Sequence, residues 1–122
     1  CFIVWRKLNI PLEGFSMSPV EYAWTSLNLN AAMCEFFSNG GSGREERFHP
    51  TQKPVELYKW IFNRFAKPGD RILDTHLGSG SSRIAAYDLG LDFVGCELDP
   101  VYYKLEEERF ARHSQQLNLF ID

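Results

Sequence analysis

Apolar residues recur at helical spacing between Pro54 and Phe65, in the most clearly patterned part of this 122-residue chain. The apolar positions form one stripe: Leu57, Tyr58, Ile61, Phe62 and Phe65. Pro54 suits the first turn of a helix, and Thr51 or Gln52 stands where a capping residue belongs. The Lys-Pro-Gly-Asp sequence at 67–70 would end the helix.

Other parts of the chain carry strand patterns. Short apolar runs predict one strand that begins at residue 2 and two further strands at 71–74 and 93–97. Alternation at 21–27 and 32–37 predicts a hairpin that turns at 28–30. After the last strand, a charged helix is expected from Asp99-Pro100 to about His113, with Glu106, Glu107, Glu108 and His113 facing solvent.

A glycine turn follows the strand at 71–74. The sequence Asp-Thr-His-Leu-Gly-Ser-Gly at 74–80 leads into a helical pattern at Ser81, so it predicts strand, turn and helix. Gly78 and Gly80 permit positive φ and a close approach of the backbone to a ligand. Glu97 follows Asp74 by 23 positions (97 − 74) at the end of the next strand, where it could accept hydrogen bonds from both ribose hydroxyls. This acid disfavours the alternative of a tight turn without a ligand.

Two residues indicate which nucleoside cofactor the turn would bind, Asp74 within it and Arg83 just after it. Arg83 occupies the position of the third glycine of the dinucleotide fingerprint, and a carboxylate at Asp74 would repel a pyrophosphate. The same carboxylate suits a cationic sulfonium. S-adenosylmethionine therefore fits better than a dinucleotide, and a nucleotide-dependent oxidoreductase is disfavoured.

The segment His-Pro-Thr-Gln-Lys-Pro at 49–54 completes a recognisable order of motifs. Helix capping explains its prolines and Thr51 but leaves His49, Gln52 and Lys53 without a role. Together with 74–80 and the Glu-Leu-Asp-Pro sequence at 97–100, it resembles the C-terminal half of the beta-type DNA amino-methyltransferases. The resemblance covers about residues 49–112, and the chain departs from it in having Thr-His at 75–76 where the family usually has Pro-Phe.

The resemblance implies a Rossmann-like α/β methyltransferase fold, with three α/β/α layers and an incomplete parallel sheet that carries an antiparallel hairpin. It implies methyl transfer from S-adenosylmethionine to the exocyclic amine of a flipped base in double-stranded DNA, with adenine N6 preferred over cytosine N4, as in restriction-modification systems. The predicted cofactor-binding residues are Pro50, Thr51, Gln52, Lys53, Asp74, His76, Gly78, Ser79, Gly80, Ser81, Glu97 and Leu98, with Thr51 and Lys53 meeting the methionine carboxylate. Tyr22 and Trp24 are the predicted substrate-binding residues, because aromatic rings could stack on a flipped base. Aromatic residues at alternate strand positions are, however, more often part of a core.

The family's catalytic segment, Asp or Asn followed by Pro-Pro-Tyr or Pro-Pro-Phe, does not occur in these residues. The chain begins at Cys1 and directly with a strand, so we interpret residues 1–122 as a single partial methyltransferase domain. We expect a strand and hairpin region at 1–38, a flexible loop at 39–48 and a cofactor-binding part at 49–122. No catalytic residue is predicted, and an N-terminal segment or a second chain would carry that motif. The alternative is a non-catalytic remnant or module that binds S-adenosylmethionine.

The missing segment also affects the expected sheet. Its strand would lie between the strands at 2 and 72, so either these pair directly, another chain fills the place, or the sheet is split.

Composition adds few constraints. A hydrophobic content of 44% supports a packed core, while a net charge of −3 gives no overall basic surface for DNA. Arg44 and Arg47 could contact phosphates, but Glu45 and Glu46 cancel their charge. The cysteines are odd in number and lack metal-ligand spacing, which fits small buried thiols in a reducing cytoplasm. The resemblance implies a bacterial or phage-encoded protein. No membrane segment and no metal site are expected.

Overall fold

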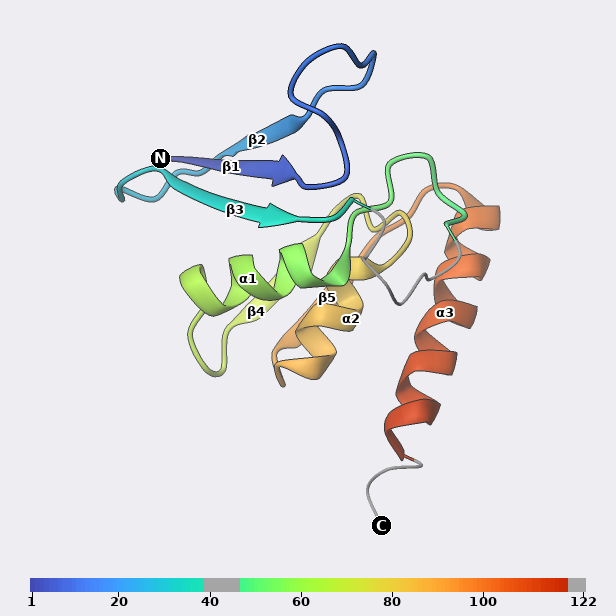
Figure 1. The fold of residues 1–122 in the computed structure, drawn as a ribbon. Helices are drawn as coiled ribbons and strands as arrows, with labels where there is room; N and C mark the ends of the chain where they lie inside the picture. The colour runs from blue at the N-terminus through green and yellow to red at the C-terminus, as the bar shows by residue number, and fades with distance from the viewer. Residues whose placement is uncertain (39–46, 119–122) are drawn as a thin grey trace. The chain divides into compact units, whose positions relative to one another are not determined.

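The computed structural model describes residues 1–38 and 47–118, which belong to two compact units, Cys1–Glu45 and Glu46–Asp122 (Figure 1). Each unit contains its own sheet and is described by itself. Most of the loop predicted at 39–48 lies outside the described residues.

The first unit is built around β1 (Phe2–Lys7), the central strand of a three-stranded sheet. β2 (Val20–Trp24) pairs with β1 in antiparallel orientation, and β3 (Ala32–Phe36) pairs with it in parallel orientation. Both edges of β1 are therefore occupied by strands of its own unit.

The two strands predicted at 21–27 and 32–37 exist, but their pairing as a hairpin is wrong. They lie on opposite sides of β1. The terminal ammonium of Cys1 donates hydrogen bonds to the carbonyls of Thr25 and Leu27, each at 2.9 Å, and the Thr25 N–H donates to the Cys1 carbonyl at 2.8 Å. Because Trp24 pairs with Phe2 and Ala32 pairs with Ile3, the connection between β2 and β3 crosses the start of β1 and no tight turn forms at 28–30.

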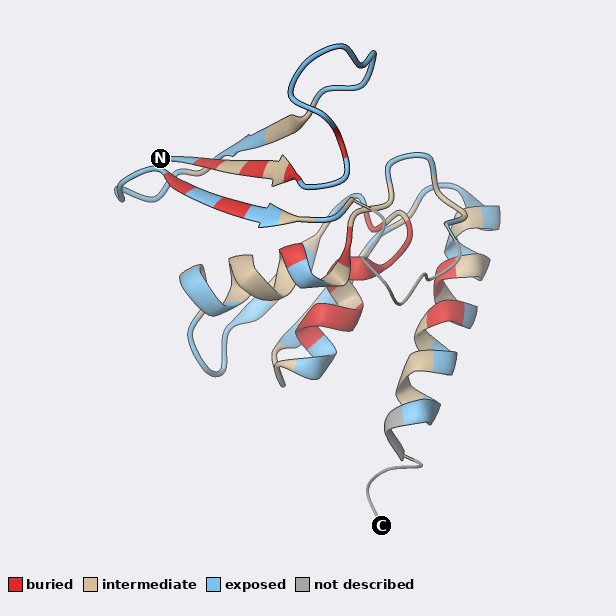
Figure 2. Cartoon of the chain, in the orientation of Figure 1, coloured by how far each residue is buried: buried red, intermediate tan, exposed pale blue. Residues whose placement is uncertain are grey.

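Alternate burial along β1 follows from the period of two in a strand (Figure 2). Ile3, Trp5 and Lys7 are buried. The Trp5 indole N–H donates to the Phe36 carbonyl at 3.2 Å. The Lys7 ammonium forms an ion pair with Glu21 at 2.7 Å and lies 5.5 Å from the centroid of the Trp5 ring. Both buried polar groups of this face are thus satisfied.

The second unit contains the remaining elements. α1 (Val55–Phe65) precedes β4 (Arg71–Asp74), which is followed by α2 (Ser81–Asp88), β5 (Asp92–Gly95) and α3 (Pro100–Asn118). β4 and β5 form a parallel pair, and within the described residues neither pairs with a strand of the first sheet. Direct pairing of the strands at 2 and 72, one of the three expected arrangements, is therefore not found among the described residues.

The short helix α2 occupies the centre of this unit because it contacts α1, β5 and α3. Ile84, Ala85 and Ala86 are buried, and small alanine side chains let the neighbouring elements approach closely. Helix α1 has the predicted range, but its N-cap is Pro54 with no side-chain cap, so the predicted capping by Thr51 or Gln52 is wrong. None of the described helices combines the length and the apolar character needed to cross a membrane.

Helix α3 differs most from its prediction, since some of its polar residues turn inward, although Glu108 is exposed as expected. Glu106 is fully buried and its Oε1 pairs with Arg83 Nη1 at 2.8 Å, so its expected exposure is wrong. His113 is half-buried and its Nε2 lies 2.7 Å from Asp88 Oδ1. The helix also continues beyond residue 113 to Asn118. Among the cysteines, Cys34 is buried as expected whereas Cys96 is exposed.

Asp88 connects all three helices of the second unit. Its Oδ2 pairs with Lys59 Nζ of α1 at 2.9 Å, while Oδ1 contacts His113 of α3. Burial opposes ionisation of Asp88, but the hydrogen bonds from His113 and Lys59 outweigh it and hold the pKa of Asp88 below its usual value.

We expect Asp88→Asn to lower the free energy of unfolding at pH 7 by about 1 to 3 kcal/mol, the range for hydrogen bonds to a charged group. Since the folded pKa lies below the unfolded value of about 3.9, this contribution is complete above that pH and is lost as pH falls through the folded pKa. Urea unfolding from pH 7 to pH 3 measures it. Asp92→Asn, which removes the exposed pair with Arg71, is the control and should change stability less. A difference between wild type and Asp88→Asn that grows on acidification would contradict the assignment.

Candidate functional site

The parallel register of β4 and β5 brings two chain segments to one edge of the sheet. Asp74 lies opposite Gly95, the Cys96 N–H donates to the Asp74 carbonyl at 2.8 Å, and the Leu77 N–H donates to the Cys96 carbonyl at 2.9 Å. The glycine turn after β4 and the residues after β5 are therefore fixed side by side, as the prediction for 74–80 and Glu97 required.

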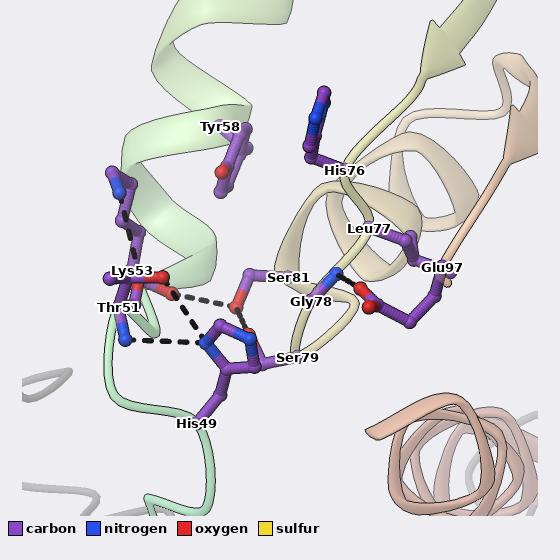
Figure 3. Close-up of a pocket in the computed structure, with 10 residues that line it drawn as sticks. All are labelled: His49, Thr51, Lys53, Tyr58, His76, Leu77, Gly78, Ser79, Ser81 and Glu97. Atoms are coloured by element: carbon purple, nitrogen blue, oxygen red, sulfur yellow. Dashed lines mark hydrogen bonds between the residues drawn. The ribbon is translucent and has the colours of Figure 1, made fainter. Parts of the chain in front are cut away.

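A cavity of about 270 Å³ opens at this edge, close to the lower end of the range for small-ligand pockets, roughly 300 to 1,000 Å³. Figure 3 shows its walls: the segment before α1 with the first turn of that helix, the glycine turn, and the acid after β5. The lining residues are His49, Thr51, Lys53, Tyr58, His76, Leu77, Gly78, Ser79, Ser81 and Glu97.

Glu97 is held toward the turn by two backbone donors. The Gly78 N–H donates to Oε2 at 2.7 Å, and the Asp99 N–H donates to Oε1 at 3.1 Å. Carboxylate oxygens have two acceptor positions each, so both can still accept from a ligand. Gly78 has φ +57°, and a Cβ there would lie 3.4 Å from the His49 ring. A larger residue would combine an unfavourable backbone with crowding against His49.

His49 lines the cavity, although it was not among the predicted cofactor-binding residues. Its Nδ1 accepts a hydrogen bond from the Thr51 N–H at 3.2 Å, and its ring lies 4.4 Å, centroid to centroid, from that of Tyr102. Because Nδ1 is an acceptor, this network assigns the proton of the neutral ring to Nε2. The signal in the sequence was that helix capping left His49 without a role.

One hydroxyl joins the two walls of the cavity. Ser81, the first residue of α2, donates from Oγ to the Lys53 carbonyl at 2.6 Å (Figure 3). The Lys53 ammonium donates to the Thr51 carbonyl at 3.4 Å. The predicted pair of Thr51 and Lys53 is thus brought to the same cavity as Gly78 and Glu97.

Helix α3 supports the turn with buried polar groups. Gly80 has φ +80°, and a Cβ at this position would collide with the side chain of Glu106. Burial raises the pKa of Glu106, while its pairing with Arg83 opposes that rise. Arg109 is also buried and donates from Nη1 to the Ser79 carbonyl at 3.0 Å and to Ser81 Oγ at 2.8 Å.

Seven of the twelve predicted cofactor-binding residues line the cavity: Thr51, Lys53, His76, Gly78, Ser79, Ser81 and Glu97. The other five, which are not among its lining residues, are Pro50, Gln52, Asp74, Gly80 and Leu98. Asp74 accepts hydrogen bonds from the Ser82 hydroxyl and the His76 N–H, and so stabilises the turn. The side chain of Leu98 is fully exposed. Tyr58 and Leu77 were missed because each reads as an ordinary apolar core position.

Tyr22 and Trp24 belong to the first unit, where their exposed fractions are 74% and 70%. The interpretation of these aromatic residues as core is therefore wrong, and their role in base binding stays a prediction. Within the described residues, no group of three or more His, Cys, Asp or Glu side chains could hold a metal ion.

Solved structures resemble the fold of this chain. The M1.HpyAVI complex with SAM superposes with a TM-score of 0.70 at 24% identity, over 89% of this chain and 60% of that one. TTHA0409 of Thermus thermophilus, in complex with S-adenosyl-L-methionine, gives a TM-score of 0.59 at 26% identity, over 92% and 52% of the two chains. The fold is that of the Rossmann-like S-adenosylmethionine-dependent methyltransferases.

Sequence comparison identifies the family. The DNA methylase family N6_N4_Mtase matches residues 16–108, and the chain belongs to this family. Type II methyltransferase M2.DpnII of Streptococcus pneumoniae is 37% identical over 67 residues, which make up 55% of this chain. The matched part spans only 25% of that relative's own length.

We expect Gly80→Ala to lower the free energy of unfolding by about 2 to 5 kcal/mol, as the sum of a left-handed backbone cost and overpacking against Glu106. Gly90→Ala is the matched control, since Gly90 has φ +68° but no atom within 4 Å of an added Cβ. Gly90→Ala should lower the free energy of unfolding only by the cost of the left-handed backbone, about 1 to 2 kcal/mol. Chemical denaturation of both variants measures the difference, and equal losses would contradict the close contact with Glu106.

Proposed function

We propose that the cavity binds S-adenosylmethionine. The observation that carries this proposal is the position of Glu97, whose carboxylate is fixed at the end of β5 beside the Gly78 N–H and faces the segment with Thr51 and Lys53. Two matched structures were solved with this cofactor bound, which supports the same ligand here.

The charges of the cavity suit the two ends of the cofactor. Glu97 would accept hydrogen bonds from the ribose hydroxyls. Lys53, with its positive charge, and Thr51 would bind the methionine carboxylate on the other wall. Glu97 is the acidic group among the lining residues, and its carboxylate favours a cationic sulfonium over a pyrophosphate.

The proposed reaction is direct transfer of the methyl group to the exocyclic amine of a base in double-stranded DNA. We propose adenine N6 in preference to cytosine N4. This chain positions the methyl donor, and a segment outside the 122 residues binds the acceptor amine. Tyr22 and Trp24 would stack on the flipped base, and their exposure leaves the rings available for this contact.

A non-catalytic module that binds S-adenosylmethionine is the second candidate. It is favoured by one observation: no Asp/Asn-Pro-Pro-aromatic segment occurs in the sequence. Both candidates require the cofactor pocket, and only the enzyme requires turnover once the acceptor-binding segment is supplied.

The first test concerns the ribose contact. Glu97→Ala should weaken binding of S-adenosylmethionine by about 1.5 to 3 kcal/mol, the range for a hydrogen bond to a charged group. Titration calorimetry with the cofactor and with S-adenosylhomocysteine measures this loss. Glu108→Ala, at an exposed position of α3, is the control and should bind like wild type. Equal affinities for Glu97→Ala and wild type would refute the role of Glu97.

The second test concerns turnover. The 122-residue chain alone should give no methyl transfer to unmethylated DNA, because the polar groups that orient the acceptor amine are missing and orientation contributes several kcal/mol to such reactions. A radiolabelled methyl-transfer assay measures this. Adding the acceptor-binding segment should restore transfer, with N6-methyladenine as the product after hydrolysis. Turnover by the chain alone would place a catalytic group within it, and N4-methylcytosine would reverse the choice of base.

A further inference from the structure

Arg109 of α3 lies behind the cavity and contacts the turn that forms one of its walls. Its exposed fraction is 3%, and it is not among the residues that line the cavity. The guanidinium donates from Nη1 to the Ser79 carbonyl at 3.0 Å and to Ser81 Oγ at 2.8 Å. Both serines line the cavity.

The contact extends to the opposite wall through one hydroxyl. Ser81 Oγ accepts from Arg109 and donates its own proton to the Lys53 carbonyl at 2.6 Å. A single buried guanidinium thus fixes two residues of the turn directly and the backbone of Lys53 indirectly. Charge-assisted hydrogen bonds are about twice as strong as neutral ones. The Arg109 guanidinium is therefore suited to fixing the two walls of the cavity relative to each other.

A second buried side chain of α3 limits how the turn can move. Glu106, one helical turn before Arg109, is fully buried against Gly80 and pairs with Arg83 of α2 at 2.8 Å. Glu106 therefore packs against the turn at Gly80, and Arg109 forms hydrogen bonds with it at Ser79 and Ser81. Neither group needs to touch a ligand to decide where the lining atoms lie.

We propose that Arg109 is a positioning residue for the cofactor. It holds Ser79, Ser81 and the Lys53 carbonyl in the arrangement that S-adenosylmethionine requires, and the inference rests on the proposed function of the cavity. Loss of the guanidinium would let the turn and the segment before α1 separate, so affinity falls although every lining residue is still present. Lysine keeps the charge but not the length or the planar group, and it should retain part of the affinity.

The experiment is a double-mutant cycle on the full chain, with the dissociation constant of S-adenosylhomocysteine as the readout. Arg109→Met and Ser81→Ala should each weaken binding about tenfold or more, the effect of losing one hydrogen bond to a charged group. The double variant should lose less than the sum of the two single losses, because each substitution removes the bond between Arg109 and Ser81. Arg109→Lys should lie between wild type and Arg109→Met.

Lys59→Met is the control for a general loss of helix packing. It removes the ion pair with Asp88 that joins α1 to α2, so it lowers stability, but it should leave the dissociation constant unchanged. All titrations are run at a temperature where circular dichroism shows each variant folded. If Arg109→Met does not fold, Arg109→Lys replaces it in the cycle with Ser81→Ala.

The outcomes separate the two levels of the proposal. A wild-type chain that does not bind S-adenosylhomocysteine or S-adenosylmethionine overturns the proposed function and this inference with it. A wild-type chain that binds, with folded Arg109 variants of equal affinity, overturns the role of Arg109 alone. Additive losses for Arg109 and Ser81, or an equal loss in Lys59→Met, also overturn it.

Discussion

The backbone of the turn between β4 and α2 is the constraint on which the cavity depends. Gly78 and Gly80 have φ values of +57° and +80°, a region that residues with a Cβ rarely adopt. In this conformation the Gly78 N–H points at Glu97, and Gly80 leaves room for the buried Glu106. The position of the Glu97 carboxylate therefore depends on the backbone of this turn as well as on the Asp99 N–H.

Polar contacts between helices hold that turn in place from two ends of α2. At its start, Ser81 joins the Lys53 carbonyl to Arg109. At its end, Asp88 joins Lys59 to His113. Between these ends Ile84, Ala85 and Ala86 are buried and pack closely. In the same stretch Ser82 donates to Asp74, and Arg83 pairs with Glu106 and Glu107, so packing and polar contacts along its whole length position the helix.

The cavity lies entirely within the second unit, so the proposal of a cofactor pocket is independent of the first unit. Family membership rests on residues 16–108, which include parts of both units. The matched solved chains are longer than this one, which covers 60% and 52% of them. The geometry of the residues present therefore supports the proposed cofactor pocket, which is the donor side of the proposed reaction.

The sequence by itself determined the local elements and the order of the motifs. Helical spacing placed α1, the run before Asp74 placed β4, and the two glycines placed the turn, because each depends on neighbours within a few residues. The resemblance to the beta-type DNA methyltransferases was also readable, since its motifs are contiguous, and the family match confirms it.

Only the tertiary structure decided the strand pairing and the burial of charged residues, because both depend on contacts between distant parts of the chain. Strand alternation predicted β2 and β3 but not their placement on both sides of β1, because strand pairing depends on backbone bonds between segments far apart in the chain. A run of charges on α3 looks solvated in sequence. Only the fold shows that Glu106 and Arg109 turn inward, because partners 23 and 28 positions away make their burial tolerable.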